Sequence, residues 1–317
     1  MTKTAGYYFY RLLERAVGAE GAASFLRLFY VKFLAVPPLR RILEANLRRV
    51  WTHAHGGPPV PREAAGVFSE MAELLAGEAL NRITFQREAA RCPAPIDLDL
   101  WPALEELRRQ ARGVVLVTPH FGDPVMLILG LARAGLPVHV MISYVTPQLR
   151  TVEGAPGLRF TDFTTGAKHY LDALARNELV LLYTDMDFFP GGRTADFFGA
   201  PCHPPHGAAR LAQAAGAPIL PVYAVKEGAR HRLCCDEAIS PEGASQEALE
   251  NAILRSQERF IGRYPSHWLI FHDPWDLEER VRTARSQLRS LNSIRSVAEW
   301  WGLLTKGSTP AKDKPWQ

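Results

Sequence analysis

Two predicted strands end in side chains that could perform acid–base chemistry. The run GVVLVTP (113–119) is followed at once by His120, and the run LVLLYT (179–184) is followed by Asp185 and Asp187. In open α/β sheets, ligands bind beyond the carboxyl ends of the strands. Either group could be a plain turn or loop-capping residue, but their occurrence at two strand ends favours a histidine general base with an orienting carboxylate.

The loops after these strands supply candidate ligand contacts. Both contain glycine, which lets a ligand approach the backbone closely. Arg193 could contact a phosphate or a phosphopantetheine arm, although a solvated loop cation would look the same in the sequence. Phe188, Phe189, Phe197 and Phe198 could line an acyl-chain tunnel, and core packing would explain the last two equally well. We therefore predict a set of substrate-binding residues: Phe121, Gly122, Arg193, Phe197, Phe198, Gly199 and His206.

Metal and thiol chemistry have weaker support. His203 and His206 flank two prolines and could join His120 at a metal, but no carboxylate or cysteine spacing supports such a site. Cys202 could attack a thioester if a neighbouring histidine activated it. The four cysteines show no C-x-x-C spacing and suggest a reducing compartment. We expect no metal and no cofactor.

The apolar pattern predicts an α/β fold, with a mostly parallel sheet flanked by helices after an N-terminal helical region. Strands alternate with helices from residue 100 onwards, as in parallel sheets covered on both faces. Strands are expected at 113–119, 138–144, 179–184, 217–225 and 267–272. Helices are expected at 40–51, 62–83, 101–111, 124–134, 167–176, 208–215 and 246–264. The predicted regions are a helical region (1–99), an α/β core (100–280), and a C-terminal helix with a disordered tail (281–317).

Composition and charge narrow the partners. The net charge of +4 is too small to indicate nucleic acid, and it suits an anionic membrane surface or an acidic carrier protein. The most apolar early segment, FLRLFYVKFLAV (25–36), carries Arg27 and Lys32 and is shorter than the roughly 20 residues of a spanning helix. It predicts either a buried helix or one lying on a membrane. We expect a cytoplasmic protein that could be peripheral on the inner face of the cell membrane.

Four segments in collinear order resemble one enzyme family. They are EANLRRVW (44–51), PHFGDPVML (119–127), DMDFFPGGRTADFFGAPCHPPHGAARLAQAAGAPILPVYAV (185–225) and RYPSHWLIFHDPW (263–275). The chain resembles the lysophospholipid-acyltransferase-like superfamily, in its lipid A lauroyl/myristoyl acyltransferase branch. The similarity runs from about residue 40 to residue 276, and the Phe-Phe-Gly-x-Pro block is its most specific part.

The resemblance implies a His-x4-Asp/Glu motif, in which the histidine deprotonates an acceptor hydroxyl and the carboxylate orients it. The donor would be a thioester of acyl carrier protein or coenzyme A. Here His120 matches the histidine, but Val125 stands at the carboxylate position. Four alternatives remain open. Asp123 takes over through a turn set by Pro124, Asp185 or Asp187 reaches across, the acceptor is an amine, or catalysis is lost.

The sequence thus predicts an acyltransferase that moves an acyl group from an acyl-carrier-protein or acyl-CoA donor to a hydroxyl or amine. The acceptor would be a lipid or a small molecule, and His120 would be the general base. An acyl-carrier-dependent N-acyltransferase of specialised-metabolite biosynthesis is one alternative. A catalytically silent protein that binds lipid or acyl carrier on the same fold is another. No nucleic-acid partner is expected.

Overall fold

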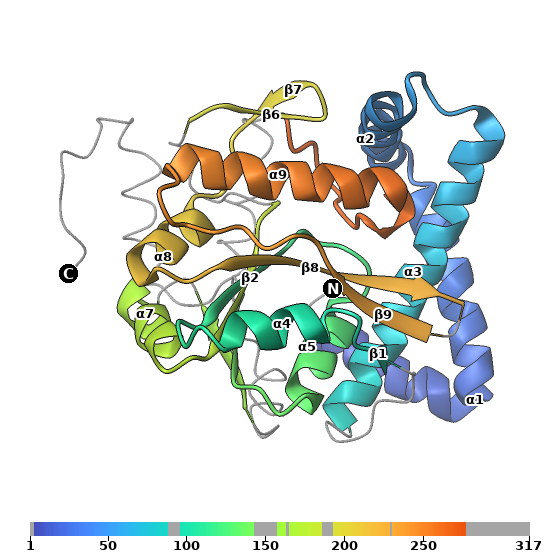
Figure 1. The fold of residues 1–317 in the computed structure, drawn as a ribbon. Coiled ribbons are helices and arrows are strands. Elements are labelled where there is room, and N and C mark those ends of the chain that lie inside the picture. Colours follow the sequence, from blue (N-terminus) through green and yellow to red (C-terminus); the bar gives the residue numbers. More distant parts are fainter. Residues whose placement is uncertain are drawn as a thin grey trace, which may run out of the picture.

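The fold is that of a computed structural model, which describes residues 3–87, 96–142, 157–162, 165–185, 193–228 and 230–276. The predicted C-terminal helix and tail (281–317) lie outside these residues, and so do Asp187, Phe188 and Phe189. Within the described part, the predicted α/β class is confirmed (Figure 1). A helical region comes first, and a mostly parallel sheet follows it.

A seven-stranded sheet in the order β1-β9-β8-β2-β5-β3-β4 forms the centre of the molecule. All its neighbouring strands run parallel except β8 and β9, which are antiparallel. The strands are β1 (Ile96–Asp97), β2 (Val114–Thr118), β3 (Val138–Ile142), β4 (Leu158–Asp162), β5 (Leu179–Tyr183), β8 (Ile219–Glu227) and β9 (Arg230–Cys235). The predicted strands at β2, β3, β5 and β8 are confirmed, whereas β1, β4 and β9 were not predicted.

The predicted strand over 267–272 is wrong. Its first residue instead ends a short 3-10 helix, Pro265–His267, and Trp268 makes an isolated antiparallel bridge with Phe121. The segment is extended because it pairs with the loop that carries His120, so its β-like sequence serves a loop rather than the sheet.

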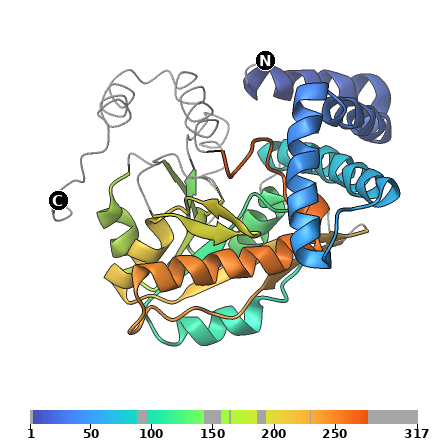
Figure 2. The ribbon, with the colours of Figure 1, turned by 90° about the horizontal axis from the view of Figure 1, so that it is seen from above.

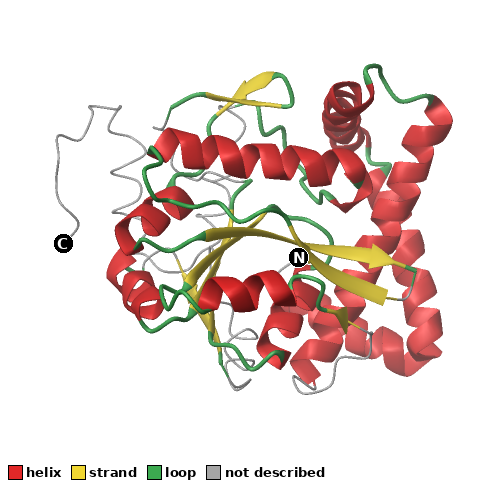
Figure 3. Ribbon diagram, viewed as in Figure 1, coloured by secondary structure: helices red, strands yellow, loops and turns green. Residues whose placement is uncertain are grey.

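Helices cover both faces of the sheet, and β2 shows why. Its side chains alternate between two cores: Val114 and Leu116 pack towards α4 and α5, and Val115 and Val117 pack towards α7, α8 and α9. The helices are α4 (Trp101–Arg108), α5 (Pro124–Arg133), α7 (Ala167–Ala175), α8 (Gly207–Ala215) and α9 (Gln246–Arg263). Figure 3 shows the sheet between these two helical layers. A buried parallel sheet of this kind leaves only its strand ends and loops for chemistry.

Three N-terminal helices pack beside this core, as seen from above in Figure 2. They are α1 (Lys3–Leu34), which kinks at Gly18, α2 (Pro37–His55) and α3 (Pro61–Arg87). Leu43 and Leu47 of α2 and Phe68 of α3 share an apolar cluster with Leu269 of the closing segment, which comprises residues 264–276 after α9. The N-terminal helices are thereby joined directly to the segment that pairs with the His120 loop.

The second half of α1 leaves large apolar side chains in solvent. Leu28 is 59% exposed and Phe29 is 51% exposed, beside the cations Arg27 and Lys32. We call this set the α1 apolar face: Phe25, Leu28, Phe29, Val31 and Phe33. Across the described part of the chain, no single helix is both long and apolar enough to cross a membrane, although the bent pair formed by 20–34 and α2 meets that test when taken together.

Candidate functional site

His120 and Asp185 meet at the carboxyl ends of two adjacent parallel strands. Thr118 of β2 is in register with Tyr183 of β5. Two residues after these positions come His120 and Asp185. His120 Nδ1 lies 2.7 Å from Asp185 Oδ1, and the His120 backbone N–H donates to Asp185 Oδ2 at 2.8 Å. The Asp185 side chain is fully buried while that of His120 is 40% exposed. The pair therefore has a protected carboxylate and an accessible imidazole.

The charges of the pair stabilise each other. Removal from bulk water lowers the pKa of the His120 imidazole, but the charge and hydrogen bond of Asp185, together with the charge of Glu78, raise it by more, and the net shift is upward from 6.5. Burial raises the pKa of the Asp185 carboxyl, but His120 and the Trp268 N–H outweigh it, and the net shift is downward. Asp185 is therefore ionised at neutral pH, and its position against Nδ1 holds the ring with Nε2 directed elsewhere.

The closing segment holds the His120 loop in place on both sides. Leu269 N–H donates to the His120 carbonyl at 2.7 Å, and Gly122 N–H donates to the His267 carbonyl at 2.7 Å. Between these bonds, the Trp268 indole N–H donates to Asp185 Oδ2 at 3.1 Å. Sequence reasoning did not assign Trp268 to the site, although its place in the family's closing block was the available signal. Trp268 positions the carboxylate, and its backbone positions the histidine loop.

Gly122 is required at its place by two independent features. Its φ is +62°, a left-handed conformation that favours glycine, and a Cβ there would lie 1.8 Å from the carbonyl oxygen of Ala224. The glycine thus lets the loop turn sharply after His120 and press against β8. Its role is a close approach of backbone to backbone, rather than the close approach of a ligand that the sequence suggested.

Asp123 does not contact the His120 ring, which one of the four alternatives from the sequence required. Its carboxylate caps α5, accepting from the backbone N–H of Val125 at 2.9 Å and of Met126 at 3.3 Å. Pro124 occupies the first helical position, as capped helices allow. Val125, at the family's carboxylate position, is buried in the core beneath α5. The structure therefore brings Asp185, and not Asp123, to the His120 ring.

Replacing Asp123 should separate capping from catalysis. We expect Asp123→Asn to retain most of the acyl-transfer rate per folded molecule, because asparagine can still cap the helix. Asp123→Ala should lower the free energy of unfolding by about 0.5–2 kcal/mol through loss of the cap. Thermal unfolding and initial rates at equal folded concentration measure the two effects. A large loss of rate in a folded Asp123→Asn variant would contradict Asp185 as the partner of His120.

Arg193 and His206, both predicted to bind substrate, converge instead on the fully buried carboxylate of Glu250. Arg193 Nε lies 2.9 Å from Glu250 Oε2, and His206 Nδ1 lies 2.6 Å from Glu250 Oε1. The Arg193 guanidinium also donates to the Glu247 carbonyl and to Asn251 on α9. Arg193 precedes and His206 follows the hairpin formed by β6 (Ala195–Phe197) and β7 (Ala200–Cys202), so these hydrogen bonds tie both ends of the hairpin to α9. Little donor capacity of Arg193 therefore remains for a phosphate.

The Phe-Phe-Gly-x-Pro block forms a tight hairpin beside the site. It joins β6 (Ala195–Phe197) to β7 (Ala200–Cys202), and its two turn residues, Phe198 and Gly199, both have positive φ. Phe197 and Phe198 are buried, and Phe198 lies against Trp268 with ring centroids 6.2 Å apart. Phe121 and the buried thiol of Cys202 belong to the same aromatic cluster. These phenylalanines are core residues that wedge the hairpin against the segment carrying Trp268.

Comparison with known proteins agrees with this architecture. The family model described as bacterial lipid A biosynthesis acyltransferase matches residues 96–276, from β1 to the end of the closing segment. A phosphatidylinositol mannoside acyltransferase of Mycolicibacterium smegmatis is 27% identical over 262 residues, which cover 75% of this chain and 82% of that protein. One from Mycobacterium tuberculosis is 29% identical over 119 residues, 38% of this chain and 37% of its own. The chain is therefore an acyltransferase, and it belongs to the bacterial lipid A biosynthesis acyltransferase family.

Proposed function

We propose that the protein transfers an acyl group from a thioester of coenzyme A or acyl carrier protein to a hydroxyl of a lipid, with His120 as the general base. The observation that carries this proposal is the contact of 2.7 Å between His120 Nδ1 and the buried carboxylate of Asp185. It leaves Nε2 for the acceptor, and none of the described residues supplies another partner for that nitrogen. Asp185 thus takes the role that the family motif gives to the position of Val125.

The reaction follows from this arrangement. His120 Nε2 accepts the proton of the acceptor hydroxyl while the oxygen attacks the thioester carbonyl carbon. The C–O bond forms, the tetrahedral intermediate collapses, and the C–S bond breaks. The imidazolium then returns its proton to the departing thiolate. Asp185 stabilises the imidazolium without itself taking the proton, because its own pKa is lowered.

A lipid acceptor has support from outside the catalytic pair. The α1 apolar face places Leu28 and Phe29 in solvent next to Arg27 and Lys32, which is the pattern of a helix lying on an anionic membrane. The relatives in both mycobacteria are named for a glycolipid acceptor. We therefore place the enzyme at a membrane surface, with a sugar hydroxyl of a lipid as the acceptor. With such a lipid as the acceptor, the acylated group is a hydroxyl and not the amine of a small metabolite.

Acyl transfer as a function of pH tests this proposal. With palmitoyl-CoA as donor and phosphatidylinositol mannoside as acceptor, we expect kcat/KM to fall as the pH drops through the pKa of His120, because the protonated imidazole cannot accept a proton. That pKa is raised, so the acidic limb should lie above pH 6.5. Product formation on thin-layer plates gives the rates. No transfer, or a rate that does not change between pH 6 and pH 8, would contradict the assignment.

A further inference from the structure

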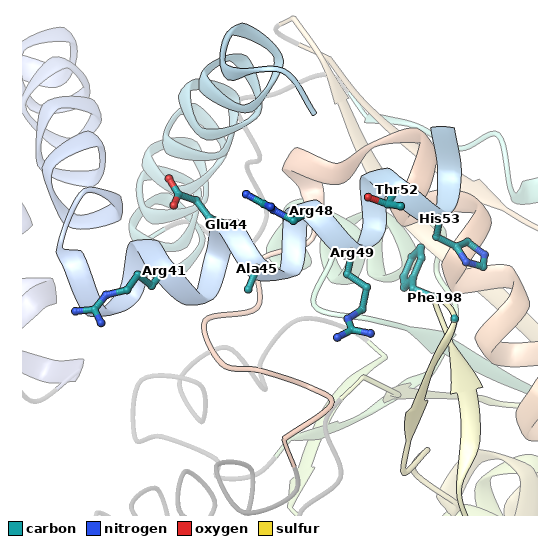
Figure 4. A pocket seen from close by; sticks show the side chains of 9 residues that line it. Arg41, Glu44, Ala45, Arg48, Arg49, Thr52, His53 and Phe198 are labelled. Carbon is teal, nitrogen blue, oxygen red and sulfur yellow. The ribbon is translucent and has the colours of Figure 1, made fainter. Parts of the chain in front are cut away.

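A groove rich in arginine runs between α2 and the turn of the β6–β7 hairpin. Its volume is about 740 Å³, and Arg41, Arg48 and Arg49 line it together with Phe198 and Gly199. Figure 4 shows the three arginines along α2 and Phe198 facing the end of that helix. Arg41 and Arg48 lie seven positions apart and therefore on one side of α2, and Arg49 lies on the neighbouring stripe, so all three border the groove.

Among the described residues, two of the three arginines in this groove are left without a neutralising partner. Arg41 and Arg48 have no ion-pair partner among the residues that the structure describes. The guanidinium of Arg49 lies over the ring of Trp275, 4.7 Å from its centroid, which orients it without cancelling its charge. The carboxylate in the groove, Glu44, is paired with Arg40 at 2.7 Å. The groove therefore offers planar donors for an anion.

The groove is linked to both the catalytic pair and the α1 apolar face. On one side, Phe198 contacts Trp268, whose indole N–H holds the carboxylate of Asp185. On the other side, α2 follows the apolar half of α1 after a bend of 81°, and Phe33 of that half contacts Phe271 of the closing segment. Contacts therefore link the groove to the segment that holds Asp185 on one side and to the apolar half of α1 on the other.

We infer that the arginine groove binds the phosphate of the lipid acceptor. This inference rests on the proposed function. In a phosphoglycolipid the phosphate lies between the fatty chains and the sugar hydroxyls, and the groove is linked both to the α1 apolar face and to the segment that holds Asp185. Guanidinium groups bind phosphate oxygens through paired, charge-assisted hydrogen bonds. Arg193, which the sequence suggested for a phosphate, is held by Glu250 instead.

Binding of glycerophosphoinositol tests the inference without requiring turnover. Isothermal calorimetry in a His120→Ala background should show that Arg41→Ala/Arg48→Ala weakens its binding by at least about tenfold. The double variant Arg112→Ala/Arg255→Ala removes the same charge from exposed positions outside the groove and should leave binding unchanged. Arg49→Lys keeps the charge but loses the planar fork, and it should weaken binding less than the double variant. Thermal unfolding verifies that each variant is folded.

Coenzyme A is the second ligand, because its phosphates offer the same chemistry from the donor side. We expect its affinity to be equal in the groove and control variants. Weaker binding of coenzyme A with unchanged binding of glycerophosphoinositol would assign the groove to the donor and overturn the inference. Equal binding of both ligands by the groove and control variants would overturn it as well. Because these measurements do not depend on catalysis, their failure is distinguishable from the absence of acyl transfer.

Discussion

Asp185→Asn is expected to lower kcat by about 10³ to 10⁴-fold while leaving the protein folded. The hydrogen bonds explain this size. Asp185 Oδ2 accepts from the His120 backbone N–H and the Trp268 indole N–H, so an asparagine carbonyl will keep that position. Its amide nitrogen then faces His120 Nδ1 and donates to it. The imidazole is forced to carry its proton on Nε2, the nitrogen that must accept one.

Asp236→Asn is a matched control for this variant. Asp236 is a largely buried carboxylate, held by Ser256 and Arg259, and it follows β9, which lies on the side of β8 away from β2. It should change stability but not kcat. Rates from acyl transfer and circular dichroism spectra are to be compared for both variants. If Asp185→Asn keeps more than about a tenth of the wild-type kcat, the carboxylate does not control the tautomer of His120.

His120→Ala should lower kcat by about 10² to 10⁴-fold, the usual contribution of a general base. The fold should survive, because the loop is fixed through the backbone groups of His120 and Gly122 rather than through the imidazole. His120→Asn is the companion variant. Its amide can replace Nδ1 at the Asp185 carboxylate but cannot accept the acceptor's proton, so it should be as inactive as alanine.

The double variant His120→Ala/Asp185→Asn separates a working pair from two independent residues. If Asp185 acts only through His120, the double variant should be no slower than the slower of the two single variants. Multiplicative losses, measured as kcat/KM under identical conditions, would mean that Asp185 contacts the substrate by itself. Substantial activity in His120→Ala would remove the histidine from its proposed role altogether.

Local sequence determined much of the core. The runs that became β2 and β5 are short and apolar, β2 is also rich in valine, and burial on both faces of a parallel sheet selects for such runs. Because parallel strands end at the same edge, the residues after them could be expected to share a site, and His120 and Asp185 do. The prediction of a strand at 267–272 failed because an extended backbone that pairs with a loop has the same residue preferences as a strand.

The sequence by itself determined the fold class, the family resemblance and the candidate base, since each depends on local periodicity or on contiguous motifs. Only the tertiary structure decided which carboxylate lies against the His120 ring, because Asp123 and Asp185 differ in how their backbones direct them. Asp123 caps the N-terminus of α5, and Asp185, which is 65 positions from His120 in the sequence, contacts the His120 ring. It also decided that Arg193 is held by Glu250, while Arg41 and Arg48 of α2 have no ion-pair partner in the described part of the chain. Charge pairing depends on which helices meet, and spacing along the chain does not encode that.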